Sequence, residues 1–244
     1  MSRSVDDLIA ATRAEAAAEP FPVDLPVYER AGRDPTEPVL YAGNLGARVC
    51  VMGRDLGKDE VAAGQPLIGA GGRLVRMGLL RAARKTPRTD DRALEAALDL
   101  AMLTNTVPFK PPGNKAYSEA VKARFRPMVA ALLVEHWQGD RILTLGNEAF
   151  EWFAPYAEPG AAEALWARED RYTLDLPVVL RSGEVEKAAT LCPLPHPSPL
   201  NQRYYGLFPG MLGARLAAAH LLEEASRGGP RRVSGAFADP DRSP

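Results

Sequence analysis

Short apolar runs alternate with helical patterns along most of the chain, and this alternation constrains the fold more than any other feature. The run at 47–53 is bounded by glycines, is too short for a helix and carries two valines, so we predict a buried parallel strand there. Strands that alternate with helices indicate an α/β fold with a mainly parallel sheet in one domain. Further strands are predicted at 100–104, 141–145, 177–180 and 189–191, with a candidate short strand at 39–42.

Helix signals lie between these runs. Ser4 is a suitable N-cap, and Asp6 and Asp7 in the first turn favour a helix over 4–18. We predict one domain over 1–225, in which 1–30 form an N-terminal helix and loop, and a disordered tail over 226–244, where apolar content is low. Other helical patterns lie at 71–85, 91–99, 118–138, 147–153 and 209–225, with a candidate kink at Pro127.

The composition is that of an ordinary globular protein, and 244 residues are enough for a full hydrophobic core. A net charge of -1 does not indicate a nucleic-acid partner, so DNA binding would depend on a local basic patch. No run is long enough to span a membrane, and the start lacks the apolar region of a signal peptide. We therefore expect a cytoplasmic protein with no membrane partner, and we expect a monomer.

The two cysteines, Cys50 and Cys192, are too few for a disulfide framework, and zinc or iron–sulfur sites usually need about four ligands. Both lie in apolar runs, where a cysteine acts as a small buried hydrophobic side chain. We expect no metal, no iron–sulfur cluster and no other cofactor.

A proline-rich stretch at 194–201 follows the last predicted strand. Its prolines exclude a helix or a central strand, and they hold His196 rigidly at the carboxyl end of that strand. Open α/β sheets bind their ligands at this edge. The spacing alone is equally compatible with a stiff turn that has no binding role.

Three stretches in chain order resemble motifs of the uracil-DNA glycosylase superfamily. Residues 196–200 (HPSPL) resemble its leucine-bearing loop, and residues 103–107 (LTNTV) resemble the strand end with the base-reading asparagine. Residues 53–57 (GRDLG) resemble the first motif, which reads GQDPY in one branch and GEAPG in the iron–sulfur branch. The resemblance covers roughly 48–221, and without four cysteines the chain would be a cluster-free member.

The resemblance implies a fold, an activity and a partner. The fold would be a three-layer sandwich whose central four-stranded, mainly parallel sheet has the order 2-1-3-4 and is flanked by helices. The activity would be that of a monofunctional DNA glycosylase, which hydrolyses the N-glycosidic bond of uracil or a related deaminated base during base excision repair. The partner would be DNA containing uracil or a damaged base.

The resemblance also implies residue roles. Asp55 falls where the GQDPY branch has its water-orienting aspartate, although an aspartate here could also cap a turn or a helix. Asn105 would read the base through its amide donor and acceptor, and the alternative is an asparagine that starts a turn. His196 would donate a hydrogen bond to uracil O2 and offset charge on the leaving base.

Two positions depart from the superfamily pattern. Gly57 falls where the GQDPY branch has a tyrosine that excludes thymine, so that gate is expected to be open. Where the superfamily usually has a phenylalanine that stacks on the flipped base, residues 64–69 carry leucine and isoleucine. Leu67 could still form the floor of the pocket, but stacking energy worth roughly 1–3 kcal/mol would shrink. With Gly53 and Arg54 of the first motif, these residues complete the expected base-binding set.

The expected DNA contacts come from the histidine loop and from basic segments. Leu200 would wedge into the duplex, unless it packs as a staple onto the core. Ser198 would bind a phosphate or its own backbone. Lys110, Asn114 and Arg203 would contact the phosphate backbone, and the alternative for each charged residue is a solvated face.

Two other kinds of function remain compatible with these residues. A superfamily member with a weakened pocket could bind DNA or a nucleotide without cleaving it. A hydrolase could instead act on free nucleotides rather than on DNA. Base release from DNA, salt-sensitive DNA binding without base release, and activity on deoxyuridine monophosphate but not on DNA would distinguish the three.

Overall fold

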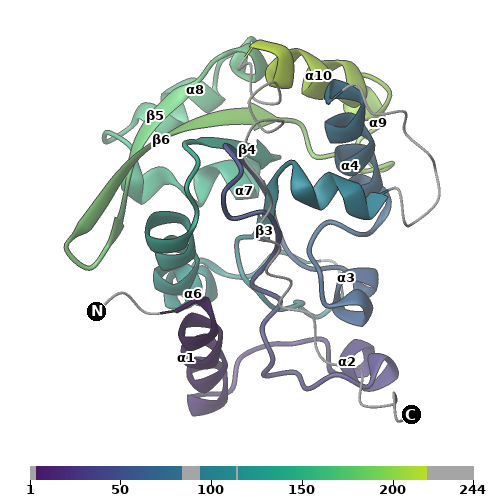
Figure 1. Ribbon diagram of the computed structural model, residues 1–244, viewed down its shortest axis with the longest axis vertical. Coiled ribbons are helices and arrows are strands. Elements are labelled where there is room, and N and C mark those ends of the chain that lie inside the picture. The colour runs from purple at the N-terminus through teal and green to yellow at the C-terminus, as the bar shows by residue number, and fades with distance from the viewer. Residues whose placement is uncertain (1–3, 84–93, 114, 219–244) are drawn as a thin grey trace.

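The computed structural model describes residues 4–83, 94–113 and 115–218, which form one six-stranded sheet with helices on both faces (Figure 1). The strand order is β1-β3-β2-β4-β6-β5. The strands are β1 (Tyr41–Gly43), β2 (Val49–Gly53), β3 (Met102–Asn105), β4 (Arg141–Leu145), β5 (Leu176–Ser182) and β6 (Val185–Leu194).

The four central strands, β3, β2, β4 and β6, run parallel to one another. Counted along the chain, they have the expected order 2-1-3-4. The expectation of a four-stranded sheet is wrong, because β1 and β5 add an antiparallel strand at each edge. β1 has only three residues, and the first half of β6 carries the charged residues Glu186 and Lys187, so an apolar pattern alone predicts too short a strand at 189–191.

The helices largely follow the predicted patterns. The helix at 4–18 begins as predicted, since the Ser4 hydroxyl accepts a hydrogen bond from the Asp7 N–H and the Asp7 carboxylate accepts one from the Ser4 N–H. The α-helices are α1 (Val5–Ala18), α2 (Leu25–Ala31), α3 (Lys58–Ala63), α4 (Ala70–Ala82), α6 (Glu119–Ala131), α7 (Asn147–Glu151), α8 (Ala161–Trp166), α9 (Gln202–Tyr205) and α10 (Phe208–Ala218). Tighter or wider turns are η1 (Ala96–Asp99), η2 (Leu132–His136), η3 (Ala154–Tyr156) and η4 (Arg171–Thr173).

Several helix predictions differ from the structure in their bounds, among them 71–85 and 147–153, which are α4 (Ala70–Ala82) and α7 (Asn147–Glu151). The long helix predicted at 118–138 ends as α6 at Ala131, and a single π-helical turn, η2, continues the chain. The pattern at 91–99 lies partly outside the described residues, and its end is the 3-10 turn η1. The predicted helix at 209–225 is described only as far as Ala218, and the predicted tail at 226–244 lies outside the described residues.

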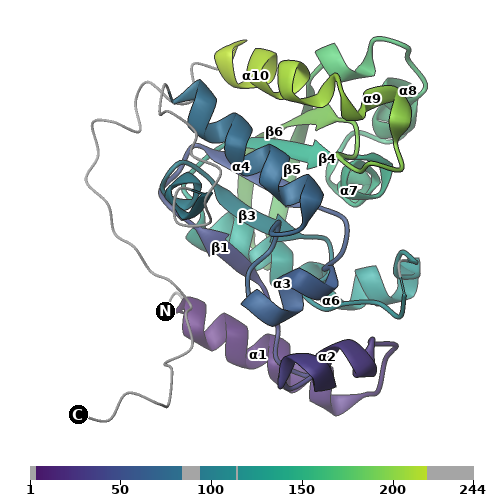
Figure 2. The same ribbon diagram turned by 90° about the vertical axis from the view of Figure 1, so that its right-hand side faces the viewer.

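Side chains of the central strands alternate between two hydrophobic layers. On β2, Cys50 and Met52 pack toward α1 and α6, whereas Val49 and Val51 pack toward α4 and α10. All four are fully buried, as expected for a parallel strand covered on both faces. Figure 2 shows α4 and α10 side by side over their face of the sheet.

An aromatic cluster fastens the chain beyond β3 to the N-terminal segment and to α6. Phe21, Phe109 and Phe125 contact one another with ring centroids 4.9–5.1 Å apart, and Tyr117 lies 6.3 Å from Phe21. Phe109 and Phe125 are fully buried. The cluster therefore anchors the segment that follows Asn105, and each ring pair adds energy beyond its buried area.

None of the helices in the described ranges is both long enough and apolar enough to cross a lipid bilayer.

Phe109→Ala should lower the free energy of unfolding by about 3–5 kcal/mol, because it leaves a cavity in this cluster. Urea denaturation followed by circular dichroism measures the change. Val185→Ala is the control, since Val185 is 52% exposed and its truncation should cost less than about 0.5 kcal/mol. Equal effects for the two variants would show that the aromatic cluster is not a principal contributor to stability.

Candidate functional site

A cavity of about 670 Å³ opens at the carboxyl edge of the parallel strands. Asp55, Asn105 and His196 all lie on its wall, after β2, at the end of β3 and after β6. The structure thus brings together three residues that are far apart in the sequence. The other predicted residues on this wall are Gly53, Arg54, Gly57, Leu67, Ser198 and Leu200.

Asn105 is the last residue of β3 and pairs in register with Gly53. It is only 2% exposed, and its Oδ1 has no hydrogen-bond partner among the described residues. A Cβ at Gly53 would lie 2.8 Å from the Asn105 Nδ2, so the glycine makes room for the amide. A buried amide oxygen without a partner costs stability, and a ligand N–H that reached it would recover that cost.

His196 projects from a loop that its own hydrogen bonds brace. Its carbonyl accepts hydrogen bonds from the Ser198 N–H (2.9 Å) and from the Asn201 side-chain amide (3.1 Å). The ring is solvent-accessible, yet the surrounding protein and then the Arg54 charge lower the pKa of His196. The lowered pKa favours the neutral imidazole near pH 7, which can donate one hydrogen bond into the cavity.

Leu200 stands at the tip of the same loop and is 92% exposed, so it is not a staple onto the core. Its N–H donates to the Ser198 hydroxyl oxygen at 3.2 Å. Ser198 therefore braces the loop through its oxygen, while its hydroxyl hydrogen remains available to an acceptor such as a phosphate.

Asp55 lies on the cavity wall, but its side chain is only 3% exposed. Arg54 Nε is 2.8 Å from its Oδ2, but neither covered carboxylate oxygen receives a well-aligned hydrogen bond from a described residue. Asp55 therefore caps no turn or helix in the described ranges. Burial raises the pKa of Asp55 to about 6, against the opposing charges of Arg54 and Lys122.

A half-buried ion pair lies near this carboxylate. Lys122 of α6 hydrogen-bonds to Glu148 of α7, and its side chain is largely buried. Lys122 lowers the pKa of Asp55 and Glu148 raises it. A buried acid with a perturbed pKa beside a cavity is a candidate functional group, because catalysis needs such groups.

Leu67 forms part of the cavity floor in an unusual backbone conformation. Its φ of 56° lies in the left-handed region, which is rare for a leucine. Arg76, itself buried, holds this turn by donating to the Leu67 carbonyl (2.9 Å) and to the Pro66 carbonyl (3.1 Å). Backbone strain held in place by such a clamp is frequent at binding sites.

Glu60 is a cavity residue that sequence reasoning missed. Its Oε1 accepts hydrogen bonds from the N–H groups of Ile68 (3.1 Å) and Gly69 (2.9 Å), so it ties the floor loop to α3. A Cβ at Gly57 would lie 2.4 Å from the Glu60 Oε2. The space expected to be open at Gly57 is thus partly occupied by a carboxylate, and no sequence signal separates Glu60 from an ordinary first-turn acid.

Two of the predicted DNA contacts, Lys110 and Arg203, are not on this wall. Lys110 is buried, and its Nζ donates to the Asp24 carboxylate (2.9 Å) and to the carbonyls of Pro111 (2.9 Å) and Gly113 (2.6 Å). All three of its donors are used within the protein, so it braces the loop rather than offering a charge to a phosphate. Arg203 is exposed on α9, and Asn114 lies outside the described residues.

The described residues contain no group of three or more histidine, cysteine, aspartate or glutamate side chains arranged to hold a metal ion.

Asp55→Asn should stabilise the protein above about pH 6. The native pKa of about 6 exceeds the ordinary 3.8, so the folded state binds the proton more tightly and stability falls as pH rises between these values. The gain should be small at pH 4 and up to about 3 kcal/mol at pH 7.5, measured by urea denaturation.

Asp34→Asn is the control of opposite sign. A hydrogen bond from the Thr36 hydroxyl lowers the pKa of Asp34, so that substitution should destabilise the protein at pH 7.5. If Asp55→Asn were no more stable than the wild type at pH 7.5, the carboxylate would not be buried as described.

Comparison with known families agrees with this geometry. No curated protein matches the chain. A family model described as the uracil DNA glycosylase superfamily matches residues 40–218, a range that begins just before β1, ends with α10 and includes every residue of the cavity wall. The chain therefore belongs to the uracil-DNA glycosylase superfamily.

Proposed function

We propose that this protein is a monofunctional DNA glycosylase, which releases uracil or a related deaminated base from DNA as a step of base excision repair. One observation carries the proposal: Asp55, Asn105 and His196, which come from three different strand ends, share the wall of one cavity. Membership of the superfamily supports the same reaction class.

The reaction breaks the bond between the base nitrogen and C1′ of the sugar, and a water molecule adds to C1′. Positive charge develops on the sugar and negative charge on the base, so the enzyme must stabilise both. The target base must first leave the helix stack and enter the cavity.

Asn105 reads the base in this proposal. Its unpaired Oδ1 can accept the N3–H of uracil while its amide N–H faces O4. Cytosine has a lone pair at N3 and an amino group at position 4. The Asn105 oxygen would then face another acceptor, and the Asn105 N–H would face another donor. Unpaired buried polar groups make such discrimination strong.

His196 stabilises the leaving base. As a neutral imidazole it donates a hydrogen bond to uracil O2, where negative charge collects as the glycosidic bond breaks. The lowered pKa of His196 favours this neutral form at physiological pH.

Asp55 contributes its negative charge to the sugar side of the reaction. Its carboxylate oxygens are covered, so orienting a water molecule would require the side chain to turn toward the cavity. Stabilisation of the positive sugar requires only that the carboxylate be ionised, because charge acts through a low-dielectric wall.

No lysine lies on the cavity wall within the described ranges, which supports hydrolysis by water rather than a Schiff-base lyase step. Leu200, exposed at the loop tip, is suited to fill the space that the flipped base leaves in the duplex. Ser198 and Arg203 would contact the adjoining phosphates.

Purified protein should release base from a uracil-containing oligonucleotide without added metal or cofactor. Asn105→Ala and His196→Ala should each lower the single-turnover rate at least roughly tenfold, about 1.4 kcal/mol of barrier. His136→Ala is a matched control, because His136 lies in η2 away from the cavity. Unchanged rates in folded Asn105→Ala and His196→Ala proteins would contradict the assigned roles.

The rate should fall on acidification below about pH 6, because protonated Asp55 carries no charge. The logarithm of the single-turnover rate should approach a slope of one against pH in this range. Asp55→Asn should be slow and should lose this slope, and a wild-type slope that persists in the variant would assign it to another group.

A DNA-binding protein that does not cleave is the second candidate. Leu67 in place of an aromatic floor and the covered Asp55 carboxylate favour it. Salt-sensitive binding to uracil-containing DNA, with no release of uracil, hypoxanthine, xanthine or mismatched thymine, would select this function.

A further inference from the structure

The short helix α9 begins two residues after Leu200 and carries Arg203. None of its residues is buried, and no other helix or strand in the described ranges packs extensively against it. A helix of four residues cannot hold itself in place by its own hydrogen bonds. Some contact outside α9 must therefore fix the segment that leaves the Leu200 loop.

Tyr204 supplies that contact. Its ring meets the ring of Tyr172 edge to face, with centroids 5.2 Å apart and an interplanar angle of 79°. Tyr172 in turn meets Trp166 edge to face at 6.0 Å. Trp166 stacks at 5.1 Å on Phe150, which is fully buried in the core. The four rings form a continuous series from the core to the exit of the loop.

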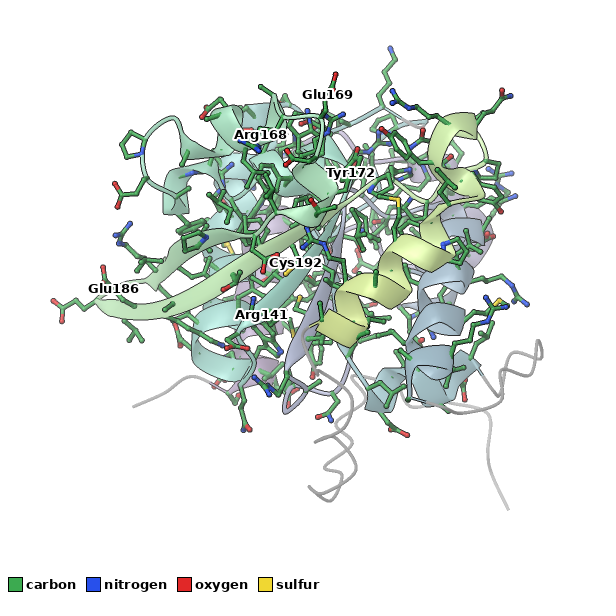
Figure 3. The ribbon with its side chains drawn as sticks, turned by 90° about the horizontal axis from the view of Figure 1, so that it is seen from above. Arg141, Arg168, Glu169, Tyr172, Glu186 and Cys192 are labelled. Atoms are coloured by element: carbon green, nitrogen blue, oxygen red, sulfur yellow. The ribbon has the colours of Figure 1, made fainter. Side chains whose placement is uncertain are left out.

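Arg171 holds the middle of this series. Its guanidinium carbon lies 5.3 Å from the Trp166 ring centre and 5.0 Å from that of Tyr172. Its Nη1 also donates to the Arg168 carbonyl at 2.7 Å. Figure 3 shows Tyr172 and Arg168 away from the far end of the β5–β6 hairpin, where Glu186 projects. The contacts of Tyr172 with Trp166 and Arg171 therefore hold its ring independently of Tyr204.

We infer that Tyr172 is a positioning residue for the Leu200 loop and acts through Tyr204. This inference rests on the proposed function, in which Leu200 enters the DNA duplex. A wedge that must displace a stacked, paired base works only if the loop that carries it does not yield. A base in single-stranded DNA has no partner strand to displace, so its release depends little on the wedge.

The same anchor positions Arg203. Its guanidinium lies over the Tyr204 ring at 5.0 Å, so the ring that meets Tyr172 also orients this exposed cation. The Tyr204 contact therefore anchors Arg203 directly and anchors the exit of the Leu200 loop, in addition to the hydrogen bonds that Ser198 and Asn201 make within that loop.

The test compares base release from duplex and from single-stranded oligonucleotides of the same sequence. Tyr172→Ala should lower the duplex rate roughly threefold to tenfold, the range expected for loss of one aromatic pair, and leave the single-strand rate within about twofold. Tyr172→Phe keeps the ring and should retain both rates. Leu200→Ala should reproduce the Tyr172→Ala pattern, and the double variant should add little to either.

An unchanged ratio of duplex to single-strand rate in Tyr172→Ala would overturn the inference, whether both rates are retained or both fall by the same factor. Amide hydrogen exchange tests the anchor independently of activity. Exchange over residues 200–205 should accelerate in Tyr172→Ala and not in Tyr172→Phe, and unchanged exchange would also overturn the inference. If the wild-type protein released no base while Tyr172→Ala still showed accelerated exchange, the proposed function would be refuted and the anchor established.

Discussion

Parallel pairing of the central strands is the constraint on which the rest of the structure depends. The register aligns Gly53 of β2 with Asn105 of β3, and Leu145 of β4 with Leu194 of β6. Because the four strands end at one level, the residues that follow them meet around a single cavity. Slippage by one residue would turn side chains to the opposite face and separate these groups. The buried, two-layered core that fixes the register is therefore also what assembles the site.

The site is built at a cost in stability. Asp55 and Asn105 hold buried polar atoms without well-aligned partners, and Leu67 keeps a left-handed backbone. Each such feature costs of order 1–3 kcal/mol, and ligand contacts are what would recover it. The aromatic cluster around Phe109 lies on the segment that follows Asn105, so favourable packing is concentrated close to the strained groups.

Apolar periodicity and the Ser4 signal allowed prediction of the parallel strands and the helix cap, because both act locally, whereas the three loops that line the cavity were predicted from the resemblance of their motifs to the superfamily. It could not reveal that β5 pairs with β6 at an edge, since pairing partners depend on the whole sheet. Lys110 resembles a solvent-exposed cation in the sequence, and only the tertiary position of Asp24 shows that its charge is used internally. The role of Glu60 likewise depends on a loop eight residues away. Local chemistry is readable from sequence, whereas burial and partners are properties of the assembled fold.

Because the cavity floor is rigid, the affinity for a base and the selectivity among bases depend on different residues. Glu60 and Arg76 hold the turn at Leu67 from both sides, so the floor cannot move to compensate for a missing aromatic ring. A base in this cavity would lose stacking energy of roughly 1–3 kcal/mol compared with an aromatic floor, whatever its identity. The amide of Asn105 still distinguishes bases, because a mismatched edge leaves buried polar atoms unpaired at a further cost of about 1–3 kcal/mol. A pocket of this kind binds every base more weakly, yet it can retain its preference among them, since the two energies come from different walls of the cavity.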